Sequence, residues 1–453
     1  MNHYQRWECL VCGLVYDEKE GWPEDGIAPG TKWEDVPDDW TCPDCGVGKE
    51  DFVLLEDSST DSQPQQAAVN DPVVIIGTGL AGYGLAKEFR KLDQRTPLCL
   101  ITSDDGQVYS KPMLSTAFTK GVSADDLIQM KADEISSQLD VTVMTNSQVE
   151  SIDSANQSVK LADSKEPIRY SNLVLALGSE AIRPTIAGDA QDKIYSVNDL
   201  QDYQRFRTQL TEYPIHKLCI IGGGLIGCEF TNDLINGGYQ TVTVDQLNHC
   251  LPTLLPEPAA RAVQAGLEAK AAKFYFNSQV TGVNHAENGV DVSLDNGEII
   301  QADLVLSAIG VRPRTALAKA AGIEINRGVV TNRLLQTSVD NIYAIGDCAE
   351  VDGHVMVYVA PLLAQVKALA KTLVGEPTQV SYPAMPVTIK VPACPTVVAP
   401  PAAGAEGQWR FEIDGQNVAG EFRNPQGELV GFALTGDATS HKSALQKQLP
   451  AIL

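Results

Sequence analysis

The feature that most constrains this fold is a glycine-rich turn that occurs twice, each time between an apolar run and a longer amphipathic segment. The two copies read "VVIIGTGLAG" and "IIGGGLIGCEF", and their glycines are Gly77, Gly79, Gly82, Gly222, Gly224 and Gly227. In a strand–turn–helix unit, G-x-G-x-x-G lets the backbone approach a pyrophosphate at the helix N-terminus. Two such units predict an α/β protein with two Rossmann-like domains and two bound dinucleotides.

An acidic residue follows each turn at the distance expected for a ribose contact. Asp104 and Asp245 each follow the last glycine of their turn by roughly 20 residues, which is the usual spacing. A carboxylate at this place accepts hydrogen bonds from ribose hydroxyls and repels a 2′-phosphate. The stretch "DQLNHCLPTLLP" that begins at Asp245 contains no arginine. We therefore expect the second unit to prefer NADH to NADPH.

Four cysteines near the start of the chain have the spacing of a metal site. Cys9 and Cys12 form one C-x2-C pair, and Cys42 and Cys45 form another further along the chain. Two such loops that face each other make a tetrahedral site of four thiolates, which suits zinc or iron. The spacing alone leaves a zinc ribbon and an iron centre open.

Aromatic residues are dense around these cysteines. The segment before the linker contains Trp7, Tyr16, Trp33, Trp40 and Phe52. This head resembles the rubredoxin family over its whole length, in "CLVCGLVYD", "APGTKWEDVPDDW" and "CPDCGVGKEDF". Leu14 stands where that family usually has an aromatic residue, for which we expect a local change of packing. The resemblance implies one iron held by Cys9, Cys12, Cys42 and Cys45, which carries one electron at a time.

Charge restricts the partners of the chain. The net charge is −24, and residues 1–56 contribute −10 of it, from four Lys/Arg and fourteen Asp/Glu. Such a chain should repel nucleic acid and anionic membranes. The acidic head either keeps the protein soluble or docks on a basic partner. The start lacks the apolar core of a signal peptide and no apolar run is long enough to span a membrane, so we expect a cytoplasmic protein.

The chain divides at a polar segment and at returns of the strand–helix pattern. Residues 57–71, "DSSTDSQPQQAAVND", read as a linker because they show no apolar periodicity. The tail is rich in Pro and Val and then alternates, which predicts a small α/β cap. The expected segments are the head (1–56), the linker (57–71), the FAD-binding domain (72–187 and 312–376), the NAD-binding domain (188–311) and the C-terminal domain (377–453).

Two further stretches, "YSKPML" and "NIYAIGDCAEV", complete a known pattern. Together with the glycine turns they resemble the FAD/NAD-linked reductase family, in its rubredoxin-reducing branch, over residues 72 to about 376. The resemblance implies flavin contacts at Gly77, Thr78, Gly79, Leu80, Ala81, Gly82, Asp104, Lys111, Val149, Gly346, Asp347 and Val359. Lys390 is a weaker candidate, for which a solvated lysine is an equal alternative. Glu229 either balances the dipole of its helix, which we favour slightly, or lies near the nicotinamide.

The disulfide branch of that family needs a second close cysteine pair, and residues 72–453 contain none in sequence. We therefore expect a hydride to pass from NADH to FAD and the electrons to leave singly for the iron, an NADH:rubredoxin oxidoreductase activity. Lys111 is expected to stabilise charge on the reduced flavin. By analogy, the downstream acceptor is an alkane monooxygenase, or else a protein that reduces oxygen, peroxide or superoxide.

Other classes of function remain open on the sequence. In one, the head is a zinc ribbon used for docking, and the body reduces a separate ferredoxin or a quinone. In another, the chain is an NADH oxidase that reduces oxygen or peroxide and is stabilised by its head. In a third, it senses NADH without catalysis. Metal content distinguishes the first, because zinc does not change its redox state.

Overall fold

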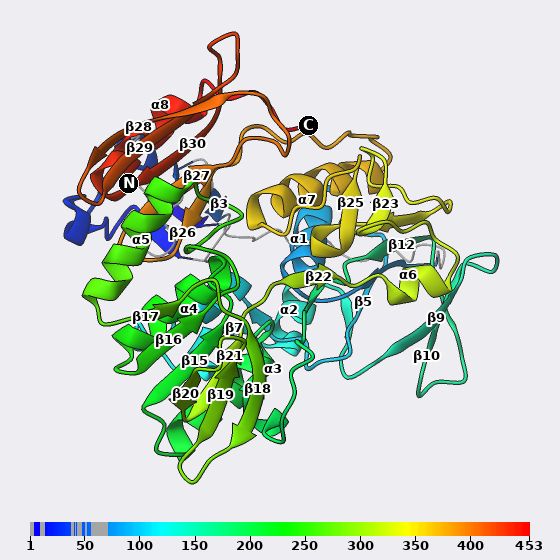
Figure 1. Ribbon diagram of the computed structural model, residues 1–453. Helices are drawn as coiled ribbons and strands as arrows, with labels where there is room; N and C mark the ends of the chain where they lie inside the picture. Colours follow the sequence, from blue (N-terminus) through cyan, green and yellow to red (C-terminus); the bar gives the residue numbers. More distant parts are fainter. Residues whose placement is uncertain are drawn as a thin grey trace.

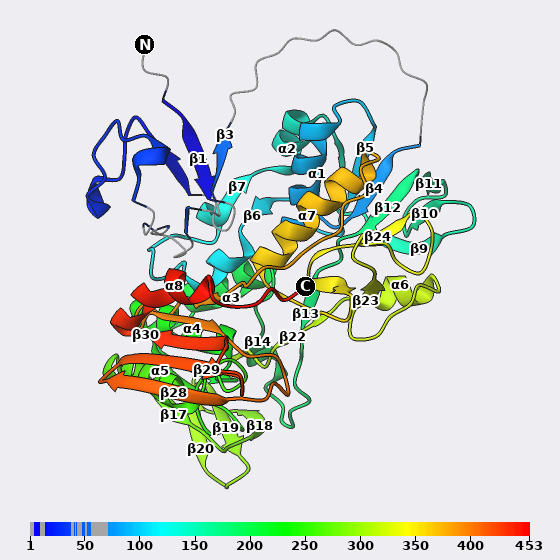
Figure 2. The same cartoon turned by 90° about the horizontal axis from the view of Figure 1, so that it is seen from above.

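The structure, a computed structural model, describes residues 4–9, 14–37, 40, 42, 48–49, 52–55 and 71–453. Figure 1 shows two α/β units side by side, with a C-terminal sheet (orange and red) against the second of them. In Figure 2 the small N-terminal head (dark blue) forms a body of its own that lies against one side of the two units. The fold class expected from the sequence, two Rossmann-like units with a metal-type head and a C-terminal domain, is confirmed.

The head is a three-stranded antiparallel sheet with an aromatic core. Its strands are β1 (Arg6–Cys9), β2 (Val15–Asp17) and β3 (Phe52–Leu55), in the order β2-β1-β3, and its 3-10 turns are η1 (Pro23–Asp25) and η2 (Trp33–Asp35). The rings of Trp7 and Trp33 stack with their centroids 5.1 Å apart, and the ring centroids of Phe52 and Trp33 are 4.8 Å apart. Leu14 packs against this core.

The first unit is built on a parallel sheet of five strands in the order β24-β12-β4-β5-β8. These are β4 (Val73–Ile76), β5 (Leu98–Ile101), β8 (Thr142–Met144), β12 (Asn172–Leu175) and β24 (Ile342–Ala344). Its helices are α1 (Leu80–Leu92), α2 (Ala132–Leu139), α6 (Ala316–Ala320) and α7 (Val359–Leu373). Every residue of "VVII" in β4 is buried, as expected for a central parallel strand covered on both faces.

The second unit repeats this plan with the strand order β14-β21-β15-β16-β17. Its strands are β14 (Ile194–Tyr195), β15 (Lys217–Ile221), β16 (Gln240–Val244), β17 (Lys273–Tyr275) and β21 (Leu304–Ser307). Its helices are α3 (Leu200–Glu212), α4 (Leu225–Asn236) and α5 (Glu257–Ala269). A three-stranded sheet of β18 (Val280–His285), β19 (Val290–Leu294) and β20 (Ile299–Ala302) covers one side.

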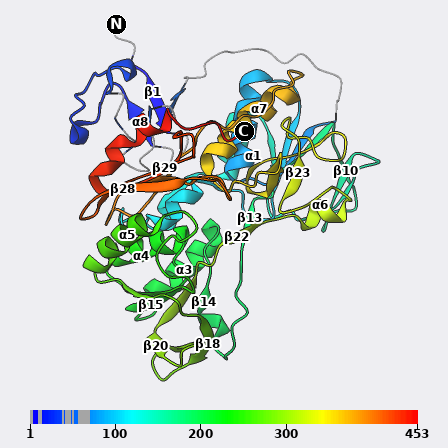
Figure 3. The same ribbon diagram turned by 45° about the horizontal axis from the view of Figure 1, so that its top comes forward.

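The C-terminal domain is an antiparallel sheet that packs on the second unit. Its strands are β26 (Val387–Ile389), β27 (Thr396–Ala399), β28 (Gln408–Asp414), β29 (Asn417–Arg423) and β30 (Leu429–Thr435), followed by η8 (Gly436–His441) and α8 (Lys442–Gln446). Val263 of α5 and Val398 of β27 share one buried core. Figure 3 shows, from top to bottom, the head, this sheet and the second unit.

Short elements connect the parts. They are β6 (Val108–Tyr109), η4 (Lys111–Ser115), η5 (Asp125–Leu127), β7 (Ile128–Met130), β9 (Val149–Asp153), β10 (Ser158–Leu161), β11 (Ile168–Arg169), β13 (Ser179–Ala181), η6 (Gln191–Lys193), β22 (Val311–Pro313), β23 (Val329–Thr331), η7 (Gly346–Cys348) and β25 (Ala349–Val351). The chain passes between the two units along β13 and β22, which pair with each other. In the described part of the chain, every helix is too short or too polar to cross a bilayer.

Candidate functional site

A cavity of about 2910 Å³ lies where the two units and the C-terminal domain meet. It collects most of the site residues predicted from the sequence. Its lining includes Gly77, Thr78, Gly79, Leu80, Ala81, Asp104, Lys111, Val149, Gly222, Gly224, Glu229, Asp245, Asp347, Val359 and Lys390. Three predicted residues, Gly82, Gly227 and Gly346, do not line it. Residues from both glycine turns therefore face one shared space, although they lie far apart in the chain.

The first glycine turn has the shape of a phosphate cradle. Gly77 has a φ of +114°, and a Cβ there would lie 2.2 Å from the carbonyl oxygen of Ala176. A Cβ on Gly82 would lie 1.9 Å from the carbonyl oxygen of Gly77, so Gly82 acts in packing the helix against the turn. A Cβ on Gly79 would meet no atom within 4 Å. This open space at the N-terminus of α1 fits a pyrophosphate.

The second turn repeats the arrangement and adds a fixed carboxylate. Gly222 has a φ of +105°, a Cβ on Gly227 would lie 1.9 Å from its carbonyl oxygen, and the space beside Gly224 is open. At the end of β16, Asp245 accepts hydrogen bonds from the amides of Gly223 (2.6 Å) and Leu247 (2.8 Å). These bonds hold the carboxylate beside the turn, where a ribose would lie.

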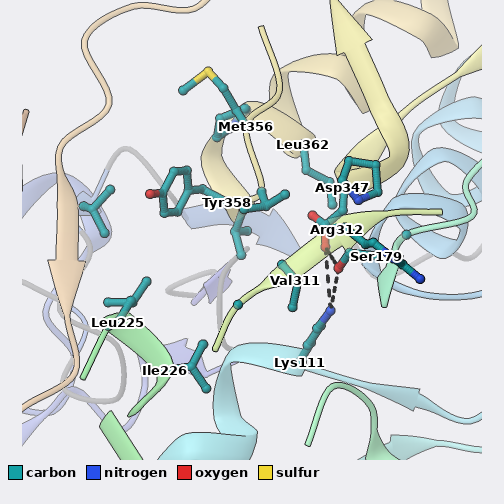
Figure 4. Close-up of a pocket in the computed structure, with 18 of the residues that line it drawn as sticks. Lys111, Ser179, Leu225, Ile226, Val311, Arg312, Asp347, Met356, Tyr358 and Leu362 are labelled. Carbon is teal, nitrogen blue, oxygen red and sulfur yellow. Dashed lines mark hydrogen bonds and ion pairs between the residues drawn. The ribbon is translucent and has the colours of Figure 1, made fainter. Parts of the chain in front are cut away.

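Lys111 is the centre of a polar network on the cavity wall, shown in Figure 4. Its ammonium group donates to Asn198 Oδ1 (3.0 Å) and Ser179 Oγ (3.3 Å) and lies 3.6 Å from Asp347 Oδ2. Ser179 in turn donates to the same oxygen of Asp347 at 2.8 Å. Burial lowers the pKa of Lys111, and Asp347 opposes that shift. Sequence reasoning missed Ser179 and Asn198, for which no local motif gave a signal.

Glu229 and Lys390 form a second network at the opposite end of η4. Lys390 Nζ lies 2.9 Å from Glu229 Oε2 and also donates to Pro112 O and Ser115 Oγ, at 2.6 and 2.9 Å. Ser115 Oγ donates to Glu229 at 2.7 Å, and the Lys390 amide donates to the other carboxylate oxygen at 3.1 Å. Glu229 is thus paired with a lysine and a serine, unlike the favoured expectation of a helix-dipole partner. Lys390 is mostly buried, unlike a solvated lysine.

The six cysteines that follow the linker are all buried. Burial raises the pKa of Cys99 and of Cys348 to about 11. Cys228 and Cys250 lie in contact, and their mutual hydrogen bond, together with burial, raises the pKa of Cys228 well above its usual value. None of the described residues that line the cavity is a cysteine. These thiols are therefore packing groups, as expected.

Two of the four metal ligands expected in the head lie among the described residues. Cys9 and Cys42 are buried in one core with Tyr16, Trp33 and Trp40, which is the apolar setting that an iron–thiolate centre needs. Cys12 and Cys45 lie outside the described residues.

The head also contains a buried acid that sequence reasoning missed. The Glu18 side chain accepts hydrogen bonds from the Lys32 ammonium at 2.8 Å and from the Trp33 amide at 3.0 Å. No spacing or motif singles this residue out among the many acids of the head. Its contacts tie the strand β2 to the turn η2 that carries Trp33.

Known families match all three parts of the chain. Residues 71–368 match the family described as pyridine nucleotide-disulphide oxidoreductase, residues 379–449 match rubredoxin binding C-terminal domain, and residues 6–52 match rubredoxin. The chain is similar to a rubredoxin-NAD(+) reductase of Alcanivorax borkumensis, with 51% identity over 383 residues that cover 84% of this chain and 99% of the relative.

Two further likenesses agree with this one. A nitric oxide reductase FlRd-NAD(+) reductase of Aliivibrio fischeri is 35% identical over 83% of this chain and 98% of its own length. The solved structure of an NADH:rubredoxin oxidoreductase from Clostridium acetobutylicum superposes with a TM-score of 0.72, over 83% of this chain and 94% of that one. At 24% identity, this similarity supports the fold of the chain but not its function.

Proposed function

The chain belongs to the pyridine nucleotide-disulphide oxidoreductase family, within its rubredoxin-NAD(+) reductases, and we propose that it reduces the rubredoxin head fused to its own N-terminus. In this proposal FAD occupies the first glycine turn and NADH the second. One observation carries it: both cradles open into a single cavity, and the same chain carries a rubredoxin domain with Cys9 and Cys42 buried in its core.

Each part of the cavity wall has a separate task. The turn at Gly79 and the turn at Gly224 bind the two pyrophosphates through backbone amides at helix N-termini. Asp245 accepts from the ribose of NADH and repels the 2′-phosphate of NADPH. Lys111, held by Ser179, Asn198 and Asp347, presents a fixed positive charge to the cavity.

When bound, FAD accepts a hydride from NADH and releases electrons singly, which matches the one-electron capacity of an iron–thiolate centre. The chain itself orients both nucleotides in the shared cavity. No described residue of the cavity wall is a thiol that could take up the electron pair. This favours transfer to the head over the dithiol chemistry of other members of the family.

An anaerobic titration of the purified holoprotein with NADH tests the proposal. We expect the flavin band and the ferric-thiolate bands to bleach together. If the flavin bleaches and the protein has no iron band, the head is a zinc-bound or empty docking module and the proposal is wrong. If the iron band persists while the flavin is fully reduced, the head is not the acceptor.

For the downstream partner we propose an alkane monooxygenase, on the resemblance to rubredoxin-dependent reductases of that type. The relative in Aliivibrio fischeri is named for a nitric oxide reductase, which makes a nitric-oxide-reducing flavoprotein the second candidate. The pre-reduced holoprotein, mixed anaerobically with each oxidised candidate, distinguishes them. We expect the head to be reoxidised at least tenfold faster by the monooxygenase, and a faster reaction with the other partner would reverse the assignment.

A further inference from the structure

Met113 is a member of two hydrophobic clusters that belong to different parts of the chain. It packs against the head core that contains Cys9, Cys42 and Trp40. It also packs against the core of the second unit, around Leu114 and Phe230. Figure 2 shows the head beside β6 and β7, the two strands that flank η4 in sequence. Met113 therefore marks the place where the head touches the reductase.

The short element η4 presents different residues to its two sides. Lys111, Pro112, Leu114 and Ser115 line the nucleotide cavity, whereas Met113 does not. Met113 instead joins the head core, although it lies within the same short turn as Lys111. A single turn of backbone thus separates the wall of the cavity from the surface of the head.

Weak contacts to its neighbours help to orient the side chain of Met113. Lys120 Nζ donates to its sulfur at 3.9 Å, and Thr116 Oγ1, which donates to the Met113 carbonyl oxygen at 3.2 Å, also lies 3.9 Å from the sulfur. A thioether is polarizable and adapts to irregular or aromatic surfaces, which suits a contact with a core rich in tryptophan. The side chain is therefore held toward the head while it keeps the ability to adjust to it.

The backbone of η4 is held from two other domains. Lys390 of the C-terminal domain donates to Pro112 O and Ser115 Oγ, and Glu229 of α4 accepts from Ser115. Just after η4, Asp233 of α4 accepts from the amides of Phe118 and Thr119, at 3.2 and 2.7 Å. A surface that is fixed before docking loses less conformational entropy when its partner arrives.

Charge also suits the contact. Residues 112–122, "PMLSTAFTKGV", contain one lysine and no acidic residue, in a chain whose net charge is −24, and this lysine, Lys120, lies next to Met113. The head alone carries −10, from four Lys/Arg and fourteen Asp/Glu among residues 1–56. Opposite charge on two tethered surfaces favours their encounter and suppresses incorrect orientations.

We propose that η4 is the docking surface on which the fused head receives electrons. Met113 is the positioning residue that anchors the head there. This proposal rests on the function proposed above and assigns the contact to the first unit as well as to the C-terminal domain whose family is named for rubredoxin binding. The occupant is the head of the same chain, so docking is intramolecular. The network of Lys390, Glu229 and Ser115 holds this docking surface in a fixed position relative to the nucleotide cavity.

The test compares Met113→Ala with Met113→Leu and with Met144→Ala in the full-length holoprotein. Met144 is the matched control, because it is also partly buried but packs against the core of the first unit. After rapid anaerobic mixing with NADH, we expect flavin reduction to proceed at the wild-type rate in all three. Reduction of the head iron should be at least tenfold slower in Met113→Ala and within twofold of wild type in the other two.

A second readout does not depend on electron transfer. Small-angle X-ray scattering should give a larger radius of gyration for Met113→Ala than for wild type, Met113→Leu and Met144→Ala, because the head dissociates from η4. Equal radii together with equal rates of head reduction would overturn the proposal, as would an equal slowing in Met144→Ala. If wild type itself does not reduce its head, the proposed function fails. The radii of gyration alone then decide whether η4 is the docking surface.

Discussion

Lys390 and Glu229 form an ion pair of 2.9 Å that joins the C-terminal domain to helix α4 of the second unit. The exposed fraction of the Glu229 side chain is 2%, and that of Lys390 is 17%. The pair is therefore largely shielded from solvent, and each charge also has hydrogen-bond partners from η4. Three parts of the protein meet at this pair, so its energetics report on how firmly they are joined.

Removal of one partner of the pair should destabilise the protein more than removal of both. Glu229→Gln and Lys390→Met each leave a buried charge without its counter-charge, which costs roughly 3–5 kcal/mol. The double variant should recover part of that loss, because neither charge is then buried. Chemical denaturation of the four proteins measures the free energies of unfolding. Single variants that unfold as wild type does, within the small range typical of surface substitutions, would show that the pair does not join the domains.

The carboxylate of Asp245 should set the choice between the two nicotinamide cofactors. In Asp245→Ala, the preference for NADH over NADPH, as a ratio of kcat/KM values, is expected to fall by at least tenfold, because a 2′-phosphate no longer meets a negative charge. Asp104→Ala is the matched control, since it changes the equivalent acid of the first cradle and should leave the ratio unchanged. Steady-state rates with an artificial electron acceptor measure both. A constant ratio in Asp245→Ala would contradict this role.

The fixed ammonium group of Lys111 should speed flavin reduction without being needed to hold FAD. For Lys111→Ala we expect unchanged FAD content and a roughly tenfold to hundredfold slower reduction by NADH, since a preorganised charge at the cavity wall is lost. Lys91→Ala on α1 is the control, because Lys91 is exposed and pairs with Glu88 at the surface. Stopped-flow absorbance measures the rate. Unchanged FAD content with an unchanged rate would refute the role given to Lys111.

The sequence predicted the parts of the site that are contiguous in the chain. A strand, a glycine turn and a helix lie next to one another, so the cradles at Gly79 and Gly224 and the acid at Asp245 follow from local spacing. Ser179 and Asn198 reach Lys111 from 68 and 87 residues away, and Lys390 reaches Glu229 from 161 residues away. Such contacts are set by how domains pack, which no local pattern encodes.

The packing of domains also decided the roles of individual residues. The sequence places Glu229 just after a glycine turn, which favours an interaction with the helix dipole, but in the structure it lies beyond the first turn of α4. Its carboxylate instead contacts Lys390 and Ser115, because the C-terminal domain brings a lysine to that point. In the same way, nothing in "YSKPML" indicates that Met113 contacts the head, since the two belong to separate domains.

Glu18 should make the head sensitive to acid. Its carboxylate accepts from the Lys32 ammonium, the Trp33 and Gln5 amides and the Trp7 indole. Burial opposes the charged form, but these hydrogen bonds outweigh it and lower the pKa of Glu18 to about 2. The carboxylate therefore stabilises the folded head at pH values above the pKa of the unfolded chain, near 4.5. That stabilisation is lost as the pH falls from there toward 2.

The neutral variant Glu18→Gln should lack this dependence and start from a less stable head. At pH 7 we expect a loss of roughly 3 kcal/mol, which corresponds to the lowered pKa of Glu18. Glu34→Gln, which changes an exposed carboxylate of η2, is the control and should behave as wild type. Loss of the ferric-thiolate band of the full-length protein during acid and denaturant titrations measures the effect. Equal acid midpoints for wild type and Glu18→Gln would mean that another group controls the acid stability of the head.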